Sequence, residues 1–372
     1  MISMETQRAH ARLVYICDWL PPEFGAVGQY SLHFARQRAR NGISVALYGL
    51  SSTTASTDIE QFPDAYLKIV RIKAGAYDKT SFHSRAWWTI RTNFRLIGRA
   101  LQDIRKGREV LFTGSPPFLL HFLAPLNLFL RKKLTYRITD FFPECLIAER
   151  KHTPLLLKLL YRLTLFWRRQ VSQFEVLGED QRRRLLEIGI EEDRIALRRD
   201  PCPVEISPAT RPCPRPAALA SFRILLYSGN FGVAHDHETF LAGYKKHHRG
   251  GNARVALWLN ASGAGAQALE NDLLREGLPF HRTQPVPLEQ LAGVLIATDA
   301  HLITLRNPFA GFVLPSKVYG CVESGKDILF IGPEDSDVHL LCSTRQASGR
   351  YFRADVGDAD QVFRILETLG IG

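Results

Sequence analysis

An alternation of short apolar runs and helix-period segments occurs twice along this chain, once on each side of a segment that contains six prolines. In the first half, an apolar run at residues 12–17 precedes a loop, a segment of helical period at residues 30–40 that ends at Asn41-Gly42, and a second apolar run at residues 43–47. An Asn-Gly stop directly before a strand is typical of a short parallel crossover. The order predicts a doubly wound, mainly parallel α/β sheet.

The proline-rich segment at residues 201–220 is expected to link two domains of this kind, because proline at such density suits neither a helix interior nor a central strand. We therefore expect one domain at residues 1–200 and another at residues 221–372. Ligands of open α/β sheets bind at the carboxyl ends of the strands. Further strands are expected at residues 66–72, 109–113, 134–139, 173–177, 222–228, 253–260, 300–305 and 328–331, and further helices at residues 82–105, after 117, and at 154–169, 179–188, 237–247, 266–276, 288–297, 318–324 and 359–369.

The formal net charge of +11 suggests an anionic partner, and basic residues are concentrated between residues 131 and 199. Nucleic acid is disfavoured, because the chain has neither the aromatic pattern of an RNA-binding sheet nor zinc-finger spacing. An anionic membrane or a phosphorylated substrate remains. The leucine-rich and basic segment at residues 154–169 suits an interfacial helix and suits ordinary core packing equally well.

Cysteine spacing and terminal composition indicate a reducing compartment. The six cysteines form no Cys-x-x-Cys pair and have no histidine at metal-ligand spacing, so neither a zinc site nor a disulfide framework is expected. Residues 1–11 lack the apolar stretch of a secretion signal. The most apolar window, residues 118–130, is shorter than the roughly 20 residues that span a bilayer. We expect a cytoplasmic protein.

The loop between the first strand and the first helix carries Gly25 and Gly28. Glycine lets the backbone approach a ligand closely, and a following helix N-terminus favours an anion. Gly28 is therefore a candidate ligand-binding residue, although a flexible connection without a ligand is an equal alternative. The spacing differs from the Gly-x-Gly-x-x-Gly dinucleotide fingerprint.

Two carboxylates, Asp140 and Glu144, follow the strand expected at residues 134–139. Carboxylates at the end of a parallel strand lie where ligands bind, so either is a candidate catalytic group that positions a sugar hydroxyl or accepts its proton. A helix cap by Asp140, with Pro143 in the first helical turn, is a compatible alternative.

The turn Gly229-Asn230-Phe231-Gly232, with His235 after it, ends the first strand of the second half. Small residues that lead into a helix suit a diphosphate, which backbone N–H groups and a nearby cation would bind. A loop that only caps its helix is the alternative.

Pro315-Ser316-Lys317 precedes a segment of helical period with Glu323 two turns along it. Ser316 or Pro315 should begin the helix, Lys317 places a cation at its start, and Ser316, Gly320 and Glu323 share one face. That face offers a phosphate site at one end. At the other end, a carboxylate can accept both hydroxyls of a ribose. A solvated surface glutamate is the alternative.

With these motifs the chain resembles the family 4 glycosyltransferases of the GT-B fold, particularly the bacterial enzymes that build cell-surface polysaccharides. The resemblance extends from residue 15 to residue 332, and its most specific segments are residues 227–232 and 315–332. It implies two Rossmann-like doubly wound domains facing a central cleft. The domain at residues 1–200 would bind the acceptor, and the domain at residues 221–372 would bind a nucleotide diphospho-sugar.

The resemblance also implies roles for single residues. In such enzymes the second glutamate of a pair binds the ribose, and Glu323 is the nearest candidate, although counting back from Gly325 places that position at Gly320. Relatives bind the diphosphate with an arginine and a lysine after the glycine turn, for which Lys317, His235 and backbone N–H groups would substitute here. Members of the family retain the anomeric configuration and need no metal or other cofactor.

The leading hypothesis is thus a retaining, UDP-sugar-dependent transferase that acts at the inner membrane face on a lipid-linked saccharide. A sugar-nucleotide 2-epimerase shares the fold and would need no acceptor. A protein that binds a sugar nucleotide or a partner enzyme without turnover is the non-enzymatic alternative.

Overall fold

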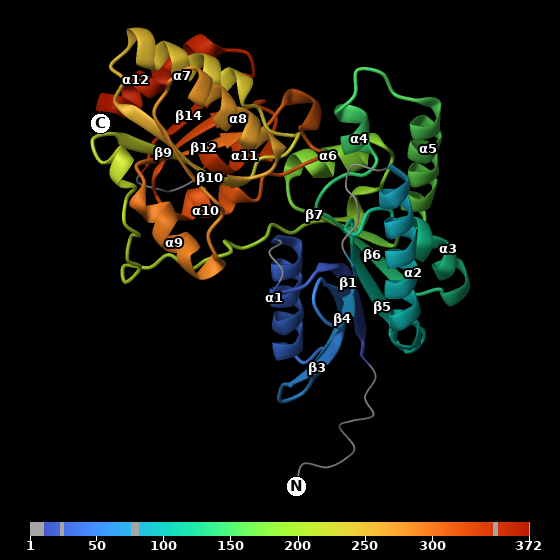
Figure 1. Ribbon diagram of the computed structural model, residues 1–372. Coiled ribbons are helices and arrows are strands. Elements are labelled where there is room, and N and C mark those ends of the chain that lie inside the picture. Colours follow the sequence, from blue (N-terminus) through green and yellow to red (C-terminus); the bar gives the residue numbers. More distant parts are fainter. Residues whose placement is uncertain (1–10, 23–25, 76–81, 345–348, 372) are drawn as a thin grey trace. The chain divides into compact units, whose positions relative to one another are not determined.

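The computed structural model describes residues 11–22, 26–75, 82–344 and 349–371, and divides into two compact units (Figure 1). The first unit comprises Met1–Leu177 and Gln181–Arg199, and the second comprises Gly178–Asp180 and Asp200–Gly372. Each unit is built around one sheet. The alternating α/β architecture predicted from the sequence is confirmed in both.

The first unit contains an eight-stranded sheet of order β3-β4-β2-β1-β5-β6-β7-β8. All neighbouring strands are parallel except β3 and β4, which are antiparallel. After β1 the chain adds strands on one side and then returns to the other side at β5, so the topological switch lies between β1 and β5. The strands are β1 (Leu13–Trp19), β2 (Val45–Ser51), β3 (Ser56–Gln61), β4 (Tyr66–Lys73), β5 (Glu109–Thr113), β6 (Lys133–Ile138), β7 (Gln173–Val176) and β8 (Ile195–Leu197).

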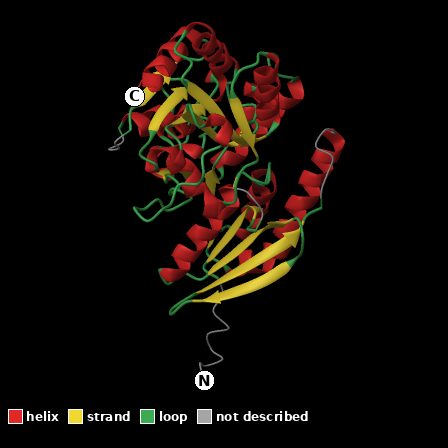
Figure 2. Cartoon of the chain, turned by 60° about the vertical axis from the view of Figure 1, so that its left-hand side comes forward, coloured by secondary structure: helices red, strands yellow, loops and turns green. Residues whose placement is uncertain are grey.

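Helices lie against this sheet and beside one another (Figure 2). Leu32, Ala35 and Ala39 of the first helix pack against Tyr15 and Leu47 of the two central strands. This i, i+3, i+7 spacing is the amphipathic pattern that predicted the helix. The helices are α1 (Ala26–Arg40), α2 (Phe82–Lys106), α3 (Leu120–Leu130), α4 (Glu144–Ala148), α5 (Leu155–Arg169) and α6 (Glu179–Glu187), with a 3-10 turn at Glu192–Arg194.

The second unit contains a six-stranded parallel sheet of order β11-β10-β9-β12-β13-β14, whose topological switch lies between β9 and β12. Its strands are β9 (Arg223–Asn230), β10 (Val255–Ser262), β11 (Phe280–Thr283), β12 (Ala300–Thr304), β13 (Asp327–Ile331) and β14 (Tyr351–Ala354). Its helices are α7 (Glu238–Gly250), α8 (Ala264–Arg275), α9 (Leu288–Ala297), α10 (Lys317–Glu323), α11 (Asp337–Ser343) and α12 (Ala359–Ile371), with 3-10 turns at Ala217–Leu219 and Asn307–Phe309.

Side chains of β9 alternate between two hydrophobic clusters. Leu225 and Tyr227 join the cluster beneath α7, α8 and α12, whereas Ile224 and Leu226 join a cluster that includes α9. A strand that is buried on both faces reads as a continuous apolar run, which is why the sequence identified it.

The proline-rich segment packs against the second unit. Val204 and Ile206 contact the cluster that contains Ile224 and Leu226, and the Cys213 N–H donates to the Gly293 carbonyl at 3.0 Å. The segment forms no strand, and its short 3-10 turn lies at its C-terminal end.

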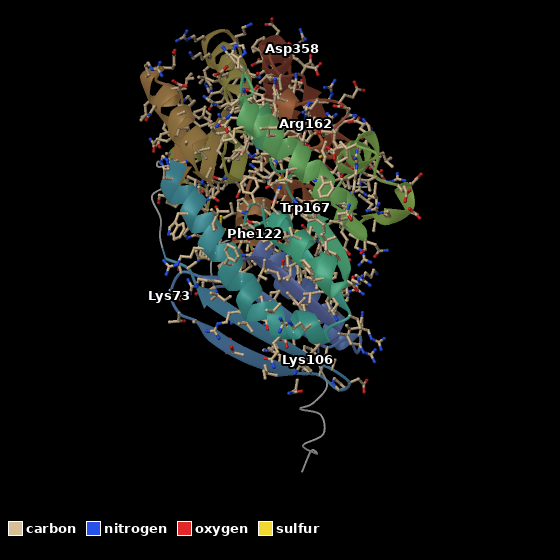
Figure 3. The ribbon with its side chains drawn as sticks, turned by 90° about the vertical axis from the view of Figure 1, so that its right-hand side faces the viewer. Lys73, Lys106, Phe122, Arg162, Trp167 and Asp358 are labelled. Carbon is tan, nitrogen blue, oxygen red and sulfur yellow. The ribbon has the colours of Figure 1, made fainter. Side chains whose placement is uncertain are left out.

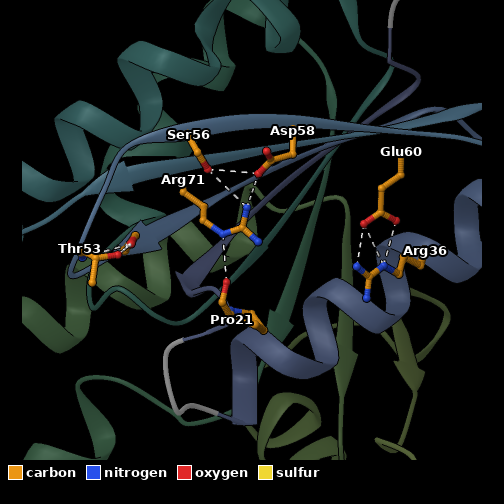
Figure 4. A network of polar contacts seen from close by, with 8 residues as sticks. Pro21, Arg36, Thr53, Ser56, Asp58, Glu60 and Arg71 are labelled. Atoms are coloured by element: carbon orange, nitrogen blue, oxygen red, sulfur yellow. Dashed lines mark hydrogen bonds and ion pairs between the residues drawn. The ribbon is translucent and has the colours of Figure 1, made fainter.

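Strand β3 was not expected, because its sequence is polar. It forms the edge of the first sheet, and its acidic side chains bind arginines of neighbouring elements (Figure 4). Asp58 Oδ2 lies 2.6 Å from Arg71 Nη1 of β4, and Glu60 Oε1 lies 2.7 Å from Arg36 Nη2 of α1. An edge strand has no second neighbour to exclude water, so charged side chains are tolerated there. The short strands β8, β11 and β14 and the helix α11 were also not expected, whereas α4 was expected only as a helix that Asp140 would cap.

Candidate active site

The residues of the expected diphosphate site meet at the carboxyl end of β9, beside β12, where the second sheet has its topological switch. Open α/β sheets bind ligands at this position. Strand β9 ends with Gly229 and Asn230, and β12 ends with Thr304. Lys317 begins α10 directly after Ser316, so the predicted helix start is confirmed.

Lys317 extends its ammonium group over the ring of Tyr227, with Nζ 3.2 Å from the ring centroid. Although the residue as a whole is half-buried, Nζ is buried and has no hydrogen-bond partner among the described residues. Burial lowers the pKa of Lys317 well below its ordinary value, whereas the aromatic face favours the ammonium form. A buried amine without an acceptor destabilises the fold, and an anion at Nζ would satisfy it.

His235 lies beside this amine. Its Nδ1 is 2.7 Å from the Thr304 carbonyl oxygen, and because a carbonyl only accepts, Nδ1 carries the proton and donates. Burial, together with the charge of Lys317, lowers the pKa of His235 to about 3. His235 is therefore neutral at physiological pH.

The glycine turn faces the lysine side chain. Gly229 has φ of 112°, a conformation that L side chains rarely adopt, and a Cβ built there would lie 4.0 Å from Lys317 Cε. The Asn230 side chain packs on Gly263, and a Cβ at Gly232 would meet the Asn230 amide at 3.4 Å. The turn is thus held close to Lys317 by backbone shape.

Phe231 differs from the other turn residues that were expected to bind the donor. It is fully buried and stacks on Tyr227, with ring centroids 4.2 Å apart. Its N–H donates to the Ser262 carbonyl, and its own carbonyl accepts from the Gly265 N–H. Because both its ring and its backbone bind within the protein, Phe231 shapes the turn and offers no group to a ligand.

Tyr227 and Arg306 belong to this site but were not singled out from the sequence. The Arg306 N–H donates to the Ala234 carbonyl, and its Nη1 donates to the Val233 carbonyl at 3.1 Å, so this arginine lies against the loop that follows the glycine turn. Residues that follow a parallel strand lie at the ligand-binding edge of the sheet, which is why Asp140 after β6 was selected. The same rule could have selected Arg306, a cation that follows β12.

The other end of α10 differs from the expectation of one continuous ligand-binding face. Gly320 is buried, and a Cβ there would lie 3.0 Å from Leu295 Cδ1, so α9 covers this face at its middle. Glu323 is exposed. The pKa of the nearby Cys202 thiol is raised mainly by burial and, to a smaller extent, by the charge of Glu323. Pro315 is buried just before the helix.

Three polar side chains follow neighbouring strands at the carboxyl edge of the first sheet. Asp18 of β1 accepts a hydrogen bond from Ser115, which follows β5, with 2.5 Å between Oδ2 and Oγ. Burial raises the pKa of Asp18, and the Ser115 hydrogen bond opposes this rise. Asp140 follows β6, and burial raises its pKa to about 6. Asp140 does not cap α4, which begins at Glu144 after Pro143. Asp18 was not identified as a candidate, because a lone aspartate at a strand end is a weak signal.

Glu144 is engaged in a buried ion pair. Both carboxylate oxygens bind Arg168: Nη1 contacts Oε1, and Nη2 lies 3.0 Å from Oε2. Arg168 is fully buried, with its guanidinium 5.0 Å from the Phe141 ring centroid. Because both of its oxygens bind Arg168, Glu144 holds α4 against α5.

Gly28 lies where α1 crosses the end of β1. A Cβ there would be 1.7 Å from the Trp19 carbonyl oxygen, so this position requires glycine for close packing of helix on strand. Glu23, Phe24 and Gly25, the other part of the loop singled out from the sequence, lie outside the described residues.

Replacing Gly28 with alanine should destabilise the first unit by about 2 kcal/mol or more, because α1 must shift away from Trp19. Gly98→Ala in the exposed middle of α2, where nothing lies within 4 Å of an added Cβ, should instead stabilise by up to about 1 kcal/mol. Denaturant unfolding of both variants measures this difference. Equal stability of the two would show that α1 does not need the close approach.

Neither a metal cluster nor a membrane-spanning helix occurs in the described part of the chain. Within residues 11–22, 26–75, 82–344 and 349–371, no three His, Cys, Asp or Glu side chains group closely enough to bind a metal ion. Among the same residues, no helix has both the length and the apolar character required to cross a bilayer.

No protein-family model matches the chain, and no curated protein matches its sequence. Solved structures match it closely in fold. HepE from Anabaena in complex with UDP-glucose has a TM-score of 0.64 and 9% identity, covering 96% of this chain and 89% of that one. WaaG, a glycosyltransferase involved in lipopolysaccharide biosynthesis, has a TM-score of 0.58 and 14% identity, covering 96% and 90%.

A protein from Listeria monocytogenes assigned as a UDP-N-acetylglucosamine 2-epimerase has a TM-score of 0.56 and 10% identity, covering 96% of this chain and 88% of that one. These likenesses extend over nearly the whole chain and include both sheets. The chain therefore has the GT-B fold, with two Rossmann-like α/β domains.

Proposed function

We propose that this protein is a glycosyltransferase that takes its sugar from a nucleotide diphospho-sugar, most simply a UDP-sugar. The observation that carries the proposal is the buried ammonium of Lys317, which has no hydrogen-bond acceptor among the described residues and lies beside Gly229 at the switch point of the second sheet. The complexes of fold relatives with UDP-glucose support the choice of donor.

In this proposal Lys317 binds the diphosphate and neutralises the charge that develops on it as the glycosidic bond breaks. Gly229, Asn230 and Gly232 let the backbone approach the phosphates, and Arg306 supplies a second cation beside the turn. Glu323 is the proposed ligand of the ribose hydroxyls. His235, through its hydrogen bond to the Thr304 carbonyl, holds the loop after the glycine turn against the end of β12.

The acceptor would bind at the carboxyl edge of the first sheet, where Asp18 and Asp140 offer carboxylates to its hydroxyl groups. We further propose transfer with retention and without a metal, in which the leaving diphosphate helps to deprotonate the acceptor. The acceptor would be a lipid-linked saccharide in surface polysaccharide biosynthesis, reached from the cytoplasmic side by a peripherally bound protein. The involvement of WaaG in lipopolysaccharide biosynthesis supports this choice.

A thermal-shift panel of UDP-, GDP- and dTDP-sugars, followed by product analysis with saccharide acceptors, tests the proposal. One nucleotide series should raise the melting temperature, because a ligand that binds only the folded state stabilises it. Transfer of the sugar from the same nucleotide should then be detected. No shift with any nucleotide would contradict the proposal, and binding without transfer to any acceptor would favour a non-catalytic binding protein.

A sugar-nucleotide 2-epimerase is the second candidate, favoured by the likeness to the Listeria structure. An epimerase converts its nucleotide sugar with no acceptor present. Incubation of the purified protein with UDP-N-acetylglucosamine alone therefore separates the two functions: a new sugar epimer supports the epimerase, and an unchanged donor supports the transferase.

The ionisation of Asp140 should appear in the pH dependence of both activity and stability. Because burial raises the pKa of Asp140 to about 6, transferase activity that uses its carboxylate should rise as the pH passes through about 6, and Asp140→Asn should lose this limb. In the unfolded chain an aspartate ionises near its ordinary pKa of about 4. Ionisation therefore lowers stability between about pH 4 and pH 6, and Asp140→Asn should raise the melting temperature more at pH 8 than at pH 4. An equal shift at both pH values would contradict this assignment.

A further inference from the structure

Three helices of the first unit expose an unusual number of large apolar side chains. Of the fifteen large apolar side chains that are exposed in the described part of the chain, ten lie on α2, α3 and α5. We call these ten residues and the basic side chains between them the outer helical face. The apolar members are Trp87, Ile90 and Phe94 of α2, Leu128 and Phe129 of α3, and Leu155, Leu156, Leu159, Leu163 and Phe166 of α5.

The three helices pack side by side, with α3 in contact with both of the others (Figure 3). Phe94 of α2 meets Phe122 of α3 edge to face, with ring centroids 5.1 Å apart. His121 Nε2 of α3 lies 3.1 Å from Thr164 Oγ1 of α5. The ten exposed apolar residues therefore lie on one layer of three neighbouring helices.

Helix α5 has a buried face and a separate, exposed apolar face. Leu157, Thr164 and Arg168 are buried, at i, i+7 and i+11, and attach the helix to the unit. Leu155, Leu159, Leu163 and Phe166 form a second stripe that is exposed, with Leu155 at 73% and Phe166 at 51% exposure. A surface helix normally turns one apolar stripe inward and polar residues outward. Contiguous exposed apolar surface of this kind marks a site of interaction.

The charges on the same helices are almost all positive. The sequences of the three helices contain one acidic residue, Asp103, whose carboxylate accepts hydrogen bonds from Tyr48 Oη and Lys68 Nζ. Arg162, which is exposed, lies about one turn after Leu159 and directly before Leu163 in α5. Exposed basic side chains on or next to these helices are Arg91, Arg95, Arg99, Arg105, Lys106, Arg131, Lys158, Arg162 and Arg169.

The basic region noted in the sequence, residues 131–199, overlaps this surface only in part, through α5 and Arg131. Many of its members bind within the protein: Arg137 and Arg198 bind Glu175, and Arg182 binds Glu192. Helix α2, which contributes Trp87 and several exposed arginines, lies outside that region altogether. The exposed cationic surface follows from how the helices pack, which the linear distribution of charge does not show.

We propose that the outer helical face binds an anionic lipid bilayer, with its leucines and aromatic rings at the boundary of headgroups and acyl chains and its arginines and lysines at the lipid phosphates. Alternation of exposed leucine and aromatic residues with basic ones, and the near absence of acidic residues, complements such a surface. The proposal deepens the proposed function, on which it rests for a lipid-linked acceptor, but its surface is defined without the donor site.

Sedimentation with vesicles tests it directly. The wild-type protein should bind vesicles of phosphatidylglycerol and phosphatidylcholine at low salt, bind less at high salt, and bind phosphatidylcholine alone weakly. Leu159→Asp combined with Leu163→Asp should lower the partition coefficient about tenfold or more, and so should Arg162→Glu. Leu274→Asp, at a leucine of α8 in the second unit that is 64% exposed, and Arg364→Glu on α12 are matched controls that should bind like the wild type.

Lack of binding to anionic vesicles at low salt, or equal binding by the α5 variants and the wild type, would overturn the proposal. Binding of heparin and vesicles alike, with no effect of the leucine changes, would also overturn it by showing a surface for polyanions in general. The melting temperature of each variant, measured without ligand, checks its fold. If vesicles bind but no nucleotide does, the proposed function fails and the docking surface stands.

Discussion

Replacing Lys317 with methionine should weaken UDP binding by about 2–5 kcal/mol, roughly 30-fold to 5,000-fold in Kd, with a much smaller effect on the stability of the ligand-free protein. Methionine is unbranched and matches the apolar part of the lysine side chain in length, but it lacks the terminal amine and its charge. The buried amine has no hydrogen-bond acceptor among the described residues, which costs about 1–3 kcal/mol, and its attraction to the Tyr227 ring offsets about 0.5–2 kcal/mol of this. Removing both effects should therefore change the free energy of unfolding by between about −1 and +2.5 kcal/mol.

Titration calorimetry with UDP and denaturant unfolding measure the two effects. Lys326→Met is the matched control, because this lysine precedes β13 at the amino end of the sheet and not at its carboxyl end. It should bind UDP like the wild type. If Lys317→Met bound UDP with unchanged Kd, the diphosphate site would lie elsewhere.

Replacing Glu144 with methionine should destabilise the first unit by about 3–5 kcal/mol. The change leaves the guanidinium of Arg168 fully buried without a counter-charge, although the Phe142 carbonyl still accepts a hydrogen bond from its Nη2 at 3.1 Å. Arg168→Met should cost less, because a carboxylate left alone can take up a proton. The double variant should recover much of the loss, because a buried ion pair replaced by apolar groups of similar volume is often neutral in stability.

Guanidinium unfolding followed by tryptophan fluorescence reports mainly on the first unit, which contains four of the five tryptophans: Trp19, Trp87, Trp88 and Trp167. Glu187→Met, which removes the exposed partner of Arg184, is the control and should cost less than about 1 kcal/mol. A Glu144→Met protein of wild-type stability with greatly reduced kcat would instead assign Glu144 to catalysis.

The strands that form the centre of each sheet could be predicted because burial on both faces leaves a continuous apolar run. Strands β2, β12 and β13 are buried along their whole length. The edge strand β3 escaped prediction because ion pairs with Arg71 and Arg36, and not apolar packing, hold it in place. Such ion pairs join residues of different elements, so the local sequence of a strand does not predict them.

The candidate site was predictable where the proposed function depends on backbone shape and on a charge at a helix start, as at Gly229 and Lys317. The partners of these residues were not predictable. Tyr227, whose ring lies beneath the Lys317 ammonium, is 90 positions away from Lys317 in the sequence. Arg168, which binds Glu144, belongs to the next helix. A sequence motif identifies the residue type at a position. The chemistry of that residue depends on the side chains that pack against it in the folded protein.

A crystal structure of the complex with UDP is the most direct test of the central claim, which is that Lys317 binds the diphosphate of a nucleotide donor. We predict a diphosphate oxygen about 2.7–3.2 Å from Lys317 Nζ, with the phosphates against the backbone of the turn at Gly229. UDP bound in the crystal away from this turn, with Lys317 Nζ still on the face of Tyr227 and without a phosphate contact, would contradict the account.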